Sequence, residues 1–434
     1  MKPFTDQFAL TVIAPIEEVQ AQELKETLAA IQQKIETNPI LPFKQIPGIH
    51  FARFVLLDAY TDASGSVIPA QLAYSSNFDG SLSEHLHQIT SPPVLMGFHR
   101  VFSGCVGFDH AAPPARAVEK FILKYQQKIH TYYRGHRGMS VSQIKDENAV
   151  RNVIQAYLDV TPLKGESTSQ LKQQIEAHVA QQMPNWKPPE TVKLTTYSLR
   201  QVALFAGLAL LVLIGISFYL SAWLGASILL FFAGSALYLR HLEKTAQPLA
   251  DGGKNFDKIQ ELSTNEDKII QNQLTHLVPL QAGVFRRTVQ QIALWALNTL
   301  ARYTYNQGRL GDIGTIHFAR WLLIDGGRRL LFFSNFDGSW ENYLGDFVDR
   351  SATGLTLAWS NTQEFPRTKW LVTEGATDEE LFKTWTRNYQ LPTQVWYSGY
   401  RDLTVKNILR NRAIALGLYQ PMTDAQTAEW LNLL

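Results

Sequence analysis

The chain contains the six-residue word SNFDGS twice, at residues 76–81 and 334–339. Each copy follows a related word, GIHFAR at residues 48–53 and TIHFAR at residues 315–320. Further matching words keep the same order in both halves: APIEEV from Ala14 with VPLQAGV from Val278, and YRGHRGMSV at 133–141 with YSGYRDLTV at 397–405. Self-similarity of this kind predicts an internal duplication, so the fold must be one that a single chain can build twice.

Between the two halves, residues 202–239 form a run of 38 residues without a charged side chain. A helix needs about 20 apolar residues to cross a bilayer, so the run is long enough for two crossings. Small and interfacial residues gather at 221–225, where we expect the chain to reverse. The run therefore predicts a transmembrane helical hairpin, with a buried hairpin inside a soluble core as the alternative.

Basic residues flank the run on both sides: Lys193 and Arg200 precede it, and Arg240 and Lys244 follow it. Positive charge favours the cytoplasmic side of a membrane, and two crossings return the chain to the side from which it started. We therefore expect a multi-pass protein of the cell inner (plasma) membrane with both globular halves in the cytoplasm. The first residues, MKPFTDQFALTV, lack the basic and apolar regions of a cleaved signal peptide.

Both halves are expected to have the same order of secondary structure, which is described here for the first half. Residues 17–37 carry apolar side chains at helical spacing, and Ser81 with Glu84 predicts a capping box at the start of a second helix. The remaining segments are expected as a strand at 8–16, a hairpin at 49–57 and 71–76, a last strand at 129–133 and a terminal helix at 140–158. The order β-α-β-β-α-β is the ferredoxin-like pattern. We expect an α+β protein in which two ferredoxin-like repeats pack as an α+β barrel or sandwich.

This interpretation divides the chain into five parts. The repeats are placed at residues 1–160 and 269–434, and the transmembrane hairpin at 199–241. Two linkers, 161–198 with a short polar helix at 170–182 and 242–268 with Gly252 and Gly253, are expected as stalks between the repeats and the membrane.

Composition excludes several classes of function. The net charge of +2 gives no indication of nucleic acid binding, and the single cysteine, Cys105, excludes an internal disulfide and a cysteine-rich metal site. The chain contains no phosphate-binding loop, dinucleotide fingerprint, nucleophile elbow or H-E-x-x-H motif.

The second half permits a register prediction for the repeated words. The turn Asp-Gly-Gly-Arg at 325–328 places Trp321 opposite Phe332, Phe318 opposite Asn335 and Ile316 opposite Asp337. Regular alternation then puts Arg320, Asn335 and Asp337 on one face and His317 on the other.

By the repeat, Arg53, Asn77 and Asp79 should form the same cluster in the first half. One interpretation of the clusters is structural: buried hydrogen bonds fix the strand register, and Asp-Gly-Ser turns the chain and caps the next helix.

A duplicated ferredoxin-like chain with an Asp-Gly turn and a nearby arginine resembles the dye-decolorising peroxidases and their α+β-barrel relatives. The family motif G-x-x-D-G is changed at its first position, where Ser76 and Ser334 stand. The resemblance implies a haem in one half, with Asp79 or Asp337 and Arg53 or Arg320 as the catalytic pair. A carboxylate next to a guanidinium suits peroxide chemistry, because one shuttles a proton and the other stabilises negative charge.

The same resemblance requires a histidine that ligates the haem iron. No histidine follows His317, whereas His99 and His110 in the first half have no counterpart in the second. They are the candidate iron ligands, and Asn77 and Asn335 are expected to help bind the cofactor. Either histidine is also explained as a surface or hydrogen-bonded residue.

The leading hypothesis is a haem-dependent, peroxidase-like membrane oxidoreductase acting on a lipid or membrane-soluble substrate. The alternative is a non-catalytic membrane protein whose paired domains bind a lipid or a protein partner. A cofactor-free monooxygenase is a third possibility, since α+β barrels also carry such sites. Membrane lipid is the expected partner in either of the first two cases, without nucleic acid, and homo-oligomerisation is left open.

Overall fold

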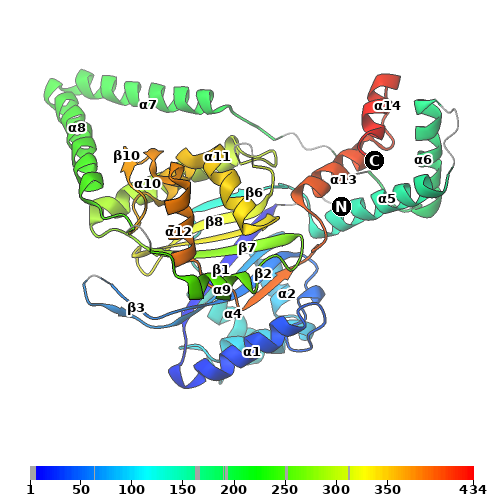
Figure 1. Ribbon diagram of the computed structural model, residues 1–434, viewed down its shortest axis with the longest axis horizontal. Coiled ribbons are helices and arrows are strands. Elements are labelled where there is room, and N and C mark those ends of the chain that lie inside the picture. Colours follow the sequence, from blue (N-terminus) through cyan, green and yellow to red (C-terminus); the bar gives the residue numbers. More distant parts are fainter. Residues whose placement is uncertain are drawn as a thin grey trace.

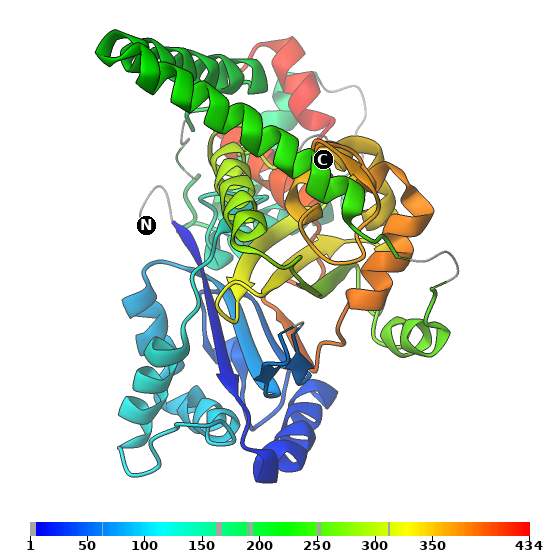
Figure 2. The same ribbon diagram turned by 90° about the vertical axis from the view of Figure 1, so that its left-hand side faces the viewer.

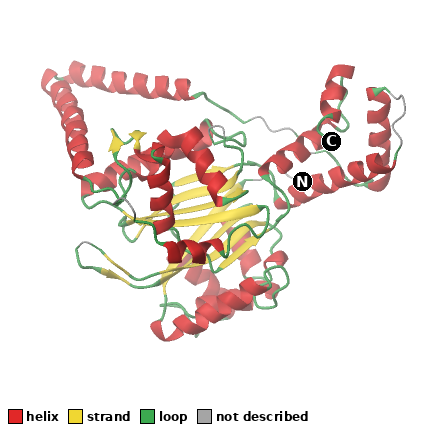
Figure 3. Cartoon of the chain, in the orientation of Figure 1, coloured by secondary structure: helices red, strands yellow, loops and turns green. Residues whose placement is uncertain are grey.

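The computed structural model describes residues 6–62, 64–161, 167–188, 190, 194–249, 253–310 and 313–434. It is a mixed α and β protein in which antiparallel strands occupy the centre and helices surround them (Figures 1 and 3). The flank residue Lys193 and the linker residue Gly252 lie outside the described residues.

The elements of the first half follow the expected order, with two extra helices, α3 and α4. They are β1 (Gln7–Pro15), α1 (Ala21–Gln33), β2 (Ile49–Leu57), a small hairpin of β3 (Tyr60–Thr61) and β4 (Val67–Ile68), β5 (Gln71–Asp79), α2 (Leu82–Ile89), α3 (Pro92–Phe102), α4 (Pro114–Tyr125), β6 (Thr131–Arg134) and α5 (Val141–Val160). The predicted capping box is confirmed, because the Ser81 hydroxyl accepts from the Glu84 amide and the Glu84 carboxylate accepts from the Ser81 amide.

The second half repeats the order with longer helices on its outer side. Its elements are β7 (Gln271–Pro279), α10 (Val284–Tyr303), β8 (Ile316–Ile324), β9 (Arg329–Asp337), α11 (Trp340–Trp359), the short strands β10 (Thr368–Lys369) and β11 (Thr373–Glu374), α12 (Glu379–Tyr389), β12 (Val395–Ser398) and α13 (Val405–Gly417). Helix α11 kinks at Ser351, whose backbone leaves the helical region.

The two four-stranded sheets exchange their edge strands. One sheet has the order β1-β5-β2-β12 and the other β6-β8-β9-β7, with antiparallel pairing throughout. Strand β6 of the first half thus completes the second sheet, and β12 of the second half completes the first. A ferredoxin-like unit would place this last strand beside its own first strand, so neither half forms a closed sheet alone.

The sheets pack face to face, with helices on their outer faces (Figure 2). One apolar core lies between the first sheet and α1, α3 and α4, and a second between the other sheet and α11 and α12. A third, smaller core lies between the sheets and includes Val55, Leu57, Leu322 and Phe333. Both faces of the central strands are therefore largely buried, although β5 and β9 end in the polar word SNFD.

The register of the β8–β9 hairpin is largely as predicted, with one correction. Trp321 pairs with Phe332 and Phe318 with Asn335, but Ile316 pairs with Phe336 rather than Asp337. A bulge between Ile316 and Phe318 shifts the register, and β2 has the same bulge between Ile49 and Phe51. The extra residue turns His317 toward Asp337, so the prediction that His317 points away from it is wrong.

The uncharged run forms two helices, α7 (Leu199–Leu220) and α8 (Ala222–Thr245), separated at Ser221 as predicted. Both are long and apolar enough to cross a membrane, and only 6% of the most apolar window of each is buried. They project from the rest of the chain (Figures 1 and 2). This arrangement contradicts the alternative of a hairpin buried in a soluble core.

The linkers are not free stalks. The predicted polar helix is α6 (Thr168–Gln182), and it packs with α5, α13 and α14 (Asp424–Leu431) in a helical lobe at one end of the molecule. The second linker contains α9 (Phe256–Ser263), which lies against α12 and donates from the Lys258 ammonium to the Asn388 carbonyl.

Candidate functional site

The two arginines of the repeated words cross from one sheet to the other. Arg53 on β2 donates to Asn335 Oδ1 at 2.5 Å and to the Ser334 carbonyl at 2.7 Å. Its other terminal nitrogen donates to β7, at the Leu274 carbonyl (2.9 Å) and at Thr275 Oγ1 and Gln273 Oε1 (both 3.2 Å). Arg53 thus binds the SNFDGS word of the opposite half.

Arg320 makes the reciprocal contacts. It donates to Asn77 Oδ1 at 2.9 Å and to the Ser76 carbonyl at 3.0 Å, and on β1 to the Leu10 carbonyl and Thr11 Oγ1. The prediction that Arg320 forms a cluster with Asn335 and Asp337 of its own half is therefore wrong. Alternation gave the correct face, but the partner lies across the sheet interface.

Both guanidinium groups are buried and surrounded by neutral acceptors. Each residue is 2% exposed, and in the described ranges neither forms an ion pair with a carboxylate. Burial lowers the pKa of Arg320 to about 10, and burial together with the neighbouring Arg320 lowers the pKa of Arg53 well below its ordinary value. Main-chain carbonyls and side-chain oxygens of the opposite half accept hydrogen bonds from both guanidinium groups and so stabilise their charge.

The two aspartates each join a histidine to a helix terminus. Asp79 accepts from His50 Nε2 at 2.9 Å and from the Val141 amide of α5 at 2.8 Å. Asp337 accepts from His317 Nε2 at 2.7 Å and from the Val405 amide of α13 at 2.7 Å. A carboxylate at a helix N-terminus is favoured by the helix dipole, so both aspartates have a structural role.

A buried chain of hydrogen bonds connects the two aspartates. From His50, Nδ1 lies 2.9 Å from the Tyr400 hydroxyl, which lies 3.1 Å from His136 Nε2. That nitrogen lies 3.4 Å from His317 Nδ1, and Gln7 Nε2 lies 3.2 Å from His136 Nδ1. His136 and Tyr400 occupy equivalent positions in the repeated words YRGHRGMSV and YSGYRDLTV.

Neutral histidines account for the contacts that link the two aspartates. His50 and His317 donate from Nε2 to the aspartates, and Tyr400 donates to His50 Nδ1. His136 Nε2–H is then shared by Tyr400 and His317, while Gln7 donates to His136 Nδ1. Burial, with His50 and His317 close by, lowers the pKa of His136 well below 6.5, which is consistent with its neutral form.

The other members of SNFDGS also have defined contacts. Ser76 Oγ bonds His85 and Ser334 Oγ bonds Tyr343. Phe78 stacks on His85 and Phe336 on Tyr343, both at 3.8 Å between ring centroids. The glycines, Gly80 and Gly338, have positive φ angles, and the last serines, Ser81 and Ser339, cap α2 and α11. Every residue of the word therefore supports the fold.

The remaining predicted ligands lie elsewhere. His99 is on α3, in the helical layer outside the first sheet, and both His99 and His110 contact the ring of Phe108. His99 is only half-buried and His110 is exposed. Among the residues that the structure describes, no group of three or more His, Cys, Asp or Glu side chains is arranged to hold a metal ion.

The residues predicted for haem do not fit it. The terminal nitrogens of Arg53 and Arg320, the Oδ1 atoms of Asn77 and Asn335 and the carboxylates of both aspartates are engaged in bonds within the protein. All of these residues except Asp79 are buried, and filling the space between the sheets with a macrocycle would break the apolar packing there.

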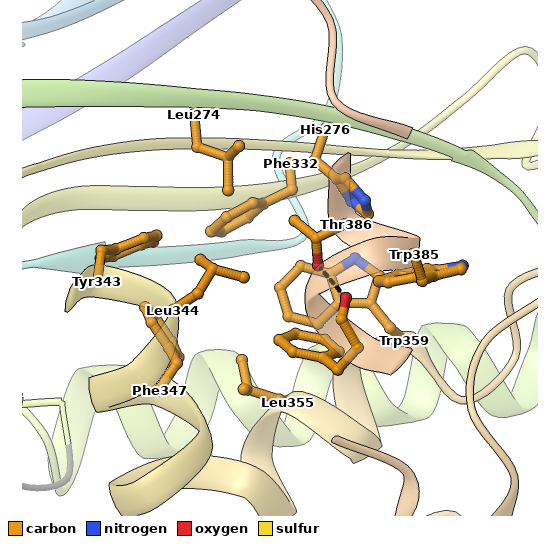
Figure 4. A pocket seen from close by; sticks show the side chains of 11 residues that line it. Leu274, His276, Phe332, Tyr343, Leu344, Phe347, Leu355, Trp359, Trp385 and Thr386 are labelled. Carbon is orange, nitrogen blue, oxygen red and sulfur yellow. Dashed lines mark hydrogen bonds between the residues drawn. The ribbon is translucent and has the colours of Figure 1, made fainter. Parts of the chain in front are cut away.

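A second histidine environment was not predicted. His276 on β7 is buried against Trp359 and Trp385 (Figure 4), and neither ring nitrogen has a hydrogen-bond partner among the residues that the structure describes. Burial lowers its pKa to about 3. The apolar cavity beside it has a volume of about 20 Å³, which suffices for one water molecule and not for an organic cofactor.

No protein-family model, curated protein or solved structure matches the chain. The function proposed below therefore depends on the sequence and the geometry alone. The sequence contained a signal for His50 and His317, because GIHFAR and TIHFAR repeat the histidine along with the arginine. Only the bulge, which alternation does not predict, hid its contact with the aspartate.

Proposed function

We propose that the chain is a non-catalytic membrane protein, in which two ferredoxin-like copies of one ancestral unit are carried on a transmembrane hairpin and bind membrane lipid. Both copies lie on the cytoplasmic side of the cell inner membrane, since the described flanks Arg200, Arg240 and Lys244 are basic. The observation that carries the proposal is the almost complete exposure of α7 and α8, two apolar helices that a water-soluble protein would have to cover.

The polar centre supports the same interpretation. Each arginine donates to main-chain carbonyls of the opposite half. Each aspartate accepts from a histidine and from the first amide of a helix. Such a network fixes the relative position of two sheets and leaves no reactive atom for a substrate. We therefore favour a structural role for this network, which holds the two copies together, over the peroxidase hypothesis.

A membrane fractionation experiment tests the anchor. We expect the full-length protein to remain in the membrane pellet after an alkaline carbonate wash. Leu211→Arg with Phe231→Arg places two charges within the hairpin, at about 2.5–3.5 kcal/mol each near a helix centre, and should shift the protein to the soluble or aggregated fraction. Leu123→Arg, on the exposed face of α4, is the control and should stay membrane-bound. Release of the unaltered protein by carbonate would contradict the proposal.

An absorption spectrum tests the non-catalytic part. We expect the purified protein to show no Soret band, before or after incubation with haem. A stoichiometric Soret band that is lost in an Asp79→Asn or Asp337→Asn variant would instead support the peroxidase hypothesis.

A further inference from the structure

Helix α10 carries an exposed apolar stripe on the side opposite its packed face. Val284, Ile292, Trp295 and Tyr303 are 78, 59, 68 and 37% exposed. At 3.6 residues per turn they fall, with Thr288 and Thr299, within an arc of about 100°. The packed face, which includes Ala293 and Leu294, lies against the second sheet and β6. The stripe is a continuous surface that the described part of the chain leaves uncovered.

The charged residues of α10 are all basic, as expected for a helix at the surface of an anionic bilayer. The helix contains three arginines and no acidic residue. Arg286 is buried and donates to the Leu242 carbonyl of α8, whereas Arg287 and Arg302 lie closer to solvent near the two ends. Aromatic and aliphatic side chains between basic residues are typical of helices that lie in the headgroup region.

The two ends of α10 meet the two ends of the apolar hairpin. At its C-terminus, Tyr303 accepts from the Tyr197 amide at 2.8 Å, and the Tyr197 ring contacts Phe205 of α7. At its N-terminus, Phe285 contacts the ring of Tyr238 near the end of α8, with centroids 5.0 Å apart. Helix α10 therefore runs between the places where α7 begins and α8 ends, as Figure 1 shows.

A second aromatic residue is held at the same end of α8. The carboxylate of Glu243 accepts from the amides of Trp370 and Leu371, both of which have positive φ angles. This contact fixes the β10–β11 turn against α8, and Trp370 is 46% exposed beneath Arg240. A fixed, exposed tryptophan beside an arginine is the pattern of a membrane interface.

We propose that the stripe of α10, together with Trp370, lies in the headgroup region of a bilayer containing anionic lipid and holds the paired sheets against the membrane. The inference rests on the proposed hairpin, because the continuity of α10 with α7 and α8 identifies lipid as the occupant. A helix joining the two ends of a membrane hairpin has to lie close to the plane in which those ends enter the bilayer.

Spin labels on single introduced cysteines test the proposal in the full-length chain. The native Cys105 is buried and does not compete for the label. Labels replace Ile292 and Trp295 on the stripe, Leu211 within α7, and Met96, an equally exposed apolar residue on α3. The protein is reconstituted in vesicles of phosphatidylcholine and phosphatidylglycerol, and each label is exposed to oxygen, which concentrates in lipid, and to a water-soluble nickel chelate.

We expect the ratio of oxygen to nickel collisions at Ile292→Cys and Trp295→Cys to be several-fold higher than at Met96→Cys and lower than at Leu211→Cys. A ratio at Ile292 equal to that at Met96, with Leu211 still in lipid, would overturn the inference and leave the hairpin intact. Low ratios at Leu211 and Ile292 alike would overturn the hairpin and the inference together. A label at Ile292 shielded from both reagents would show that another protein surface covers the stripe, and would also overturn the lipid assignment.

Discussion

The two Asp residues of the repeated word each connect a histidine to the start of a helix. Each accepts one bond from a histidine of its own half and one from the first amide of α5 or α13. Asp337 is the more buried of the two, with 7% of its side chain exposed against 14% for Asp79. This difference ranks the expected effects of substitution.

Replacing either Asp by asparagine keeps the shape of the side chain and removes its charge. We expect Asp337→Asn to lower the free energy of unfolding by about 1.5–3 kcal/mol, because hydrogen bonds to a charged group are lost, and Asp79→Asn to cost less. Chemical denaturation in detergent measures both. Asp402→Asn, on an exposed part of the same segment as Tyr400, is the control, and equal effects at all three positions would contradict the assignment.

His276 makes the stability of the protein sensitive to acid. Its pKa is about 3 in the folded protein and 6.5 ordinarily, because burial disfavours the charged form. Between pH 6.5 and 3 the unfolded chain therefore binds a proton at His276 that the folded chain does not. The stability due to neutral His276 is complete above pH 6.5 and falls by about 1.4 kcal/mol per pH unit between pH 6.5 and 3.

Substitution by phenylalanine should remove this dependence. We expect His276→Phe to leave the protein as stable as before or about 1 kcal/mol more stable at pH 7, since it removes two buried nitrogens that no described residue bonds. Below pH 6 the variant should lose stability less steeply with falling pH than the unaltered chain. Parallel unfolding curves for the two proteins from pH 7 to pH 4 would contradict this account.

At the scale of elements, the sequence predicted the strands and helices that carry its periodic and repeated segments. It predicted β1, β2, β5, α1, α5, α6 and the break between α7 and α8 within a few residues. It did not predict α3, α4 or the β3–β4 hairpin, and two further features were missed for a physical reason. A bulge has no sequence signal in an apolar strand, and the partner of an edge strand depends on packing between distant segments.

The strand exchange depends on two equivalent glycines. Gly135 follows β6 and Gly399 follows β12, and their amides donate to the His317 and His50 carbonyls at 2.8 Å. A Cβ at Gly135 would lie 2.0 Å from the Ile316 carbonyl oxygen, and one at Gly399 would lie 2.5 Å from that of Ile49. Each exchanged strand thus ends against the bulge of the other half.

Adding a methyl group at these positions should therefore weaken the exchange. We expect Gly135→Ala and Gly399→Ala each to lower the free energy of unfolding by about 1–3 kcal/mol or more, because main-chain atoms must move. Gly345→Ala is the matched control: its Cβ would meet only the end of Lys383, and in the middle of α11 it should stabilise by up to about 1 kcal/mol. Equal tolerance at all three glycines would show that the close approach is not maintained in solution.

At the scale of the whole molecule, the exchanged strands and crossed arginines make the halves mutually dependent. Further contacts between them include the ion pairs of Arg412 with Glu147 at 2.7 Å and Arg328 with Asp62 at 3.0 Å. The repeated words in the sequence predicted two similar halves. They did not predict that each arginine would bind the asparagine of the other copy. The same residues can form such a cluster either within one copy or between the two copies, and the sequence does not distinguish these two arrangements.

Cleavage of the chain between the halves distinguishes these two arrangements. A protease site inserted after the exposed Lys187 divides the chain into a fragment with the first half and α6, and a fragment with the hairpin and the second half. We expect the first fragment to stay with the membrane pellet after cleavage and a neutral wash, because its β6 remains in the second sheet and its own sheet holds β12. Only denaturant should release it. If each half instead formed a complete sheet, with the arginines bonded within their own copies, the first fragment would appear in the supernatant as soon as the linker was cut.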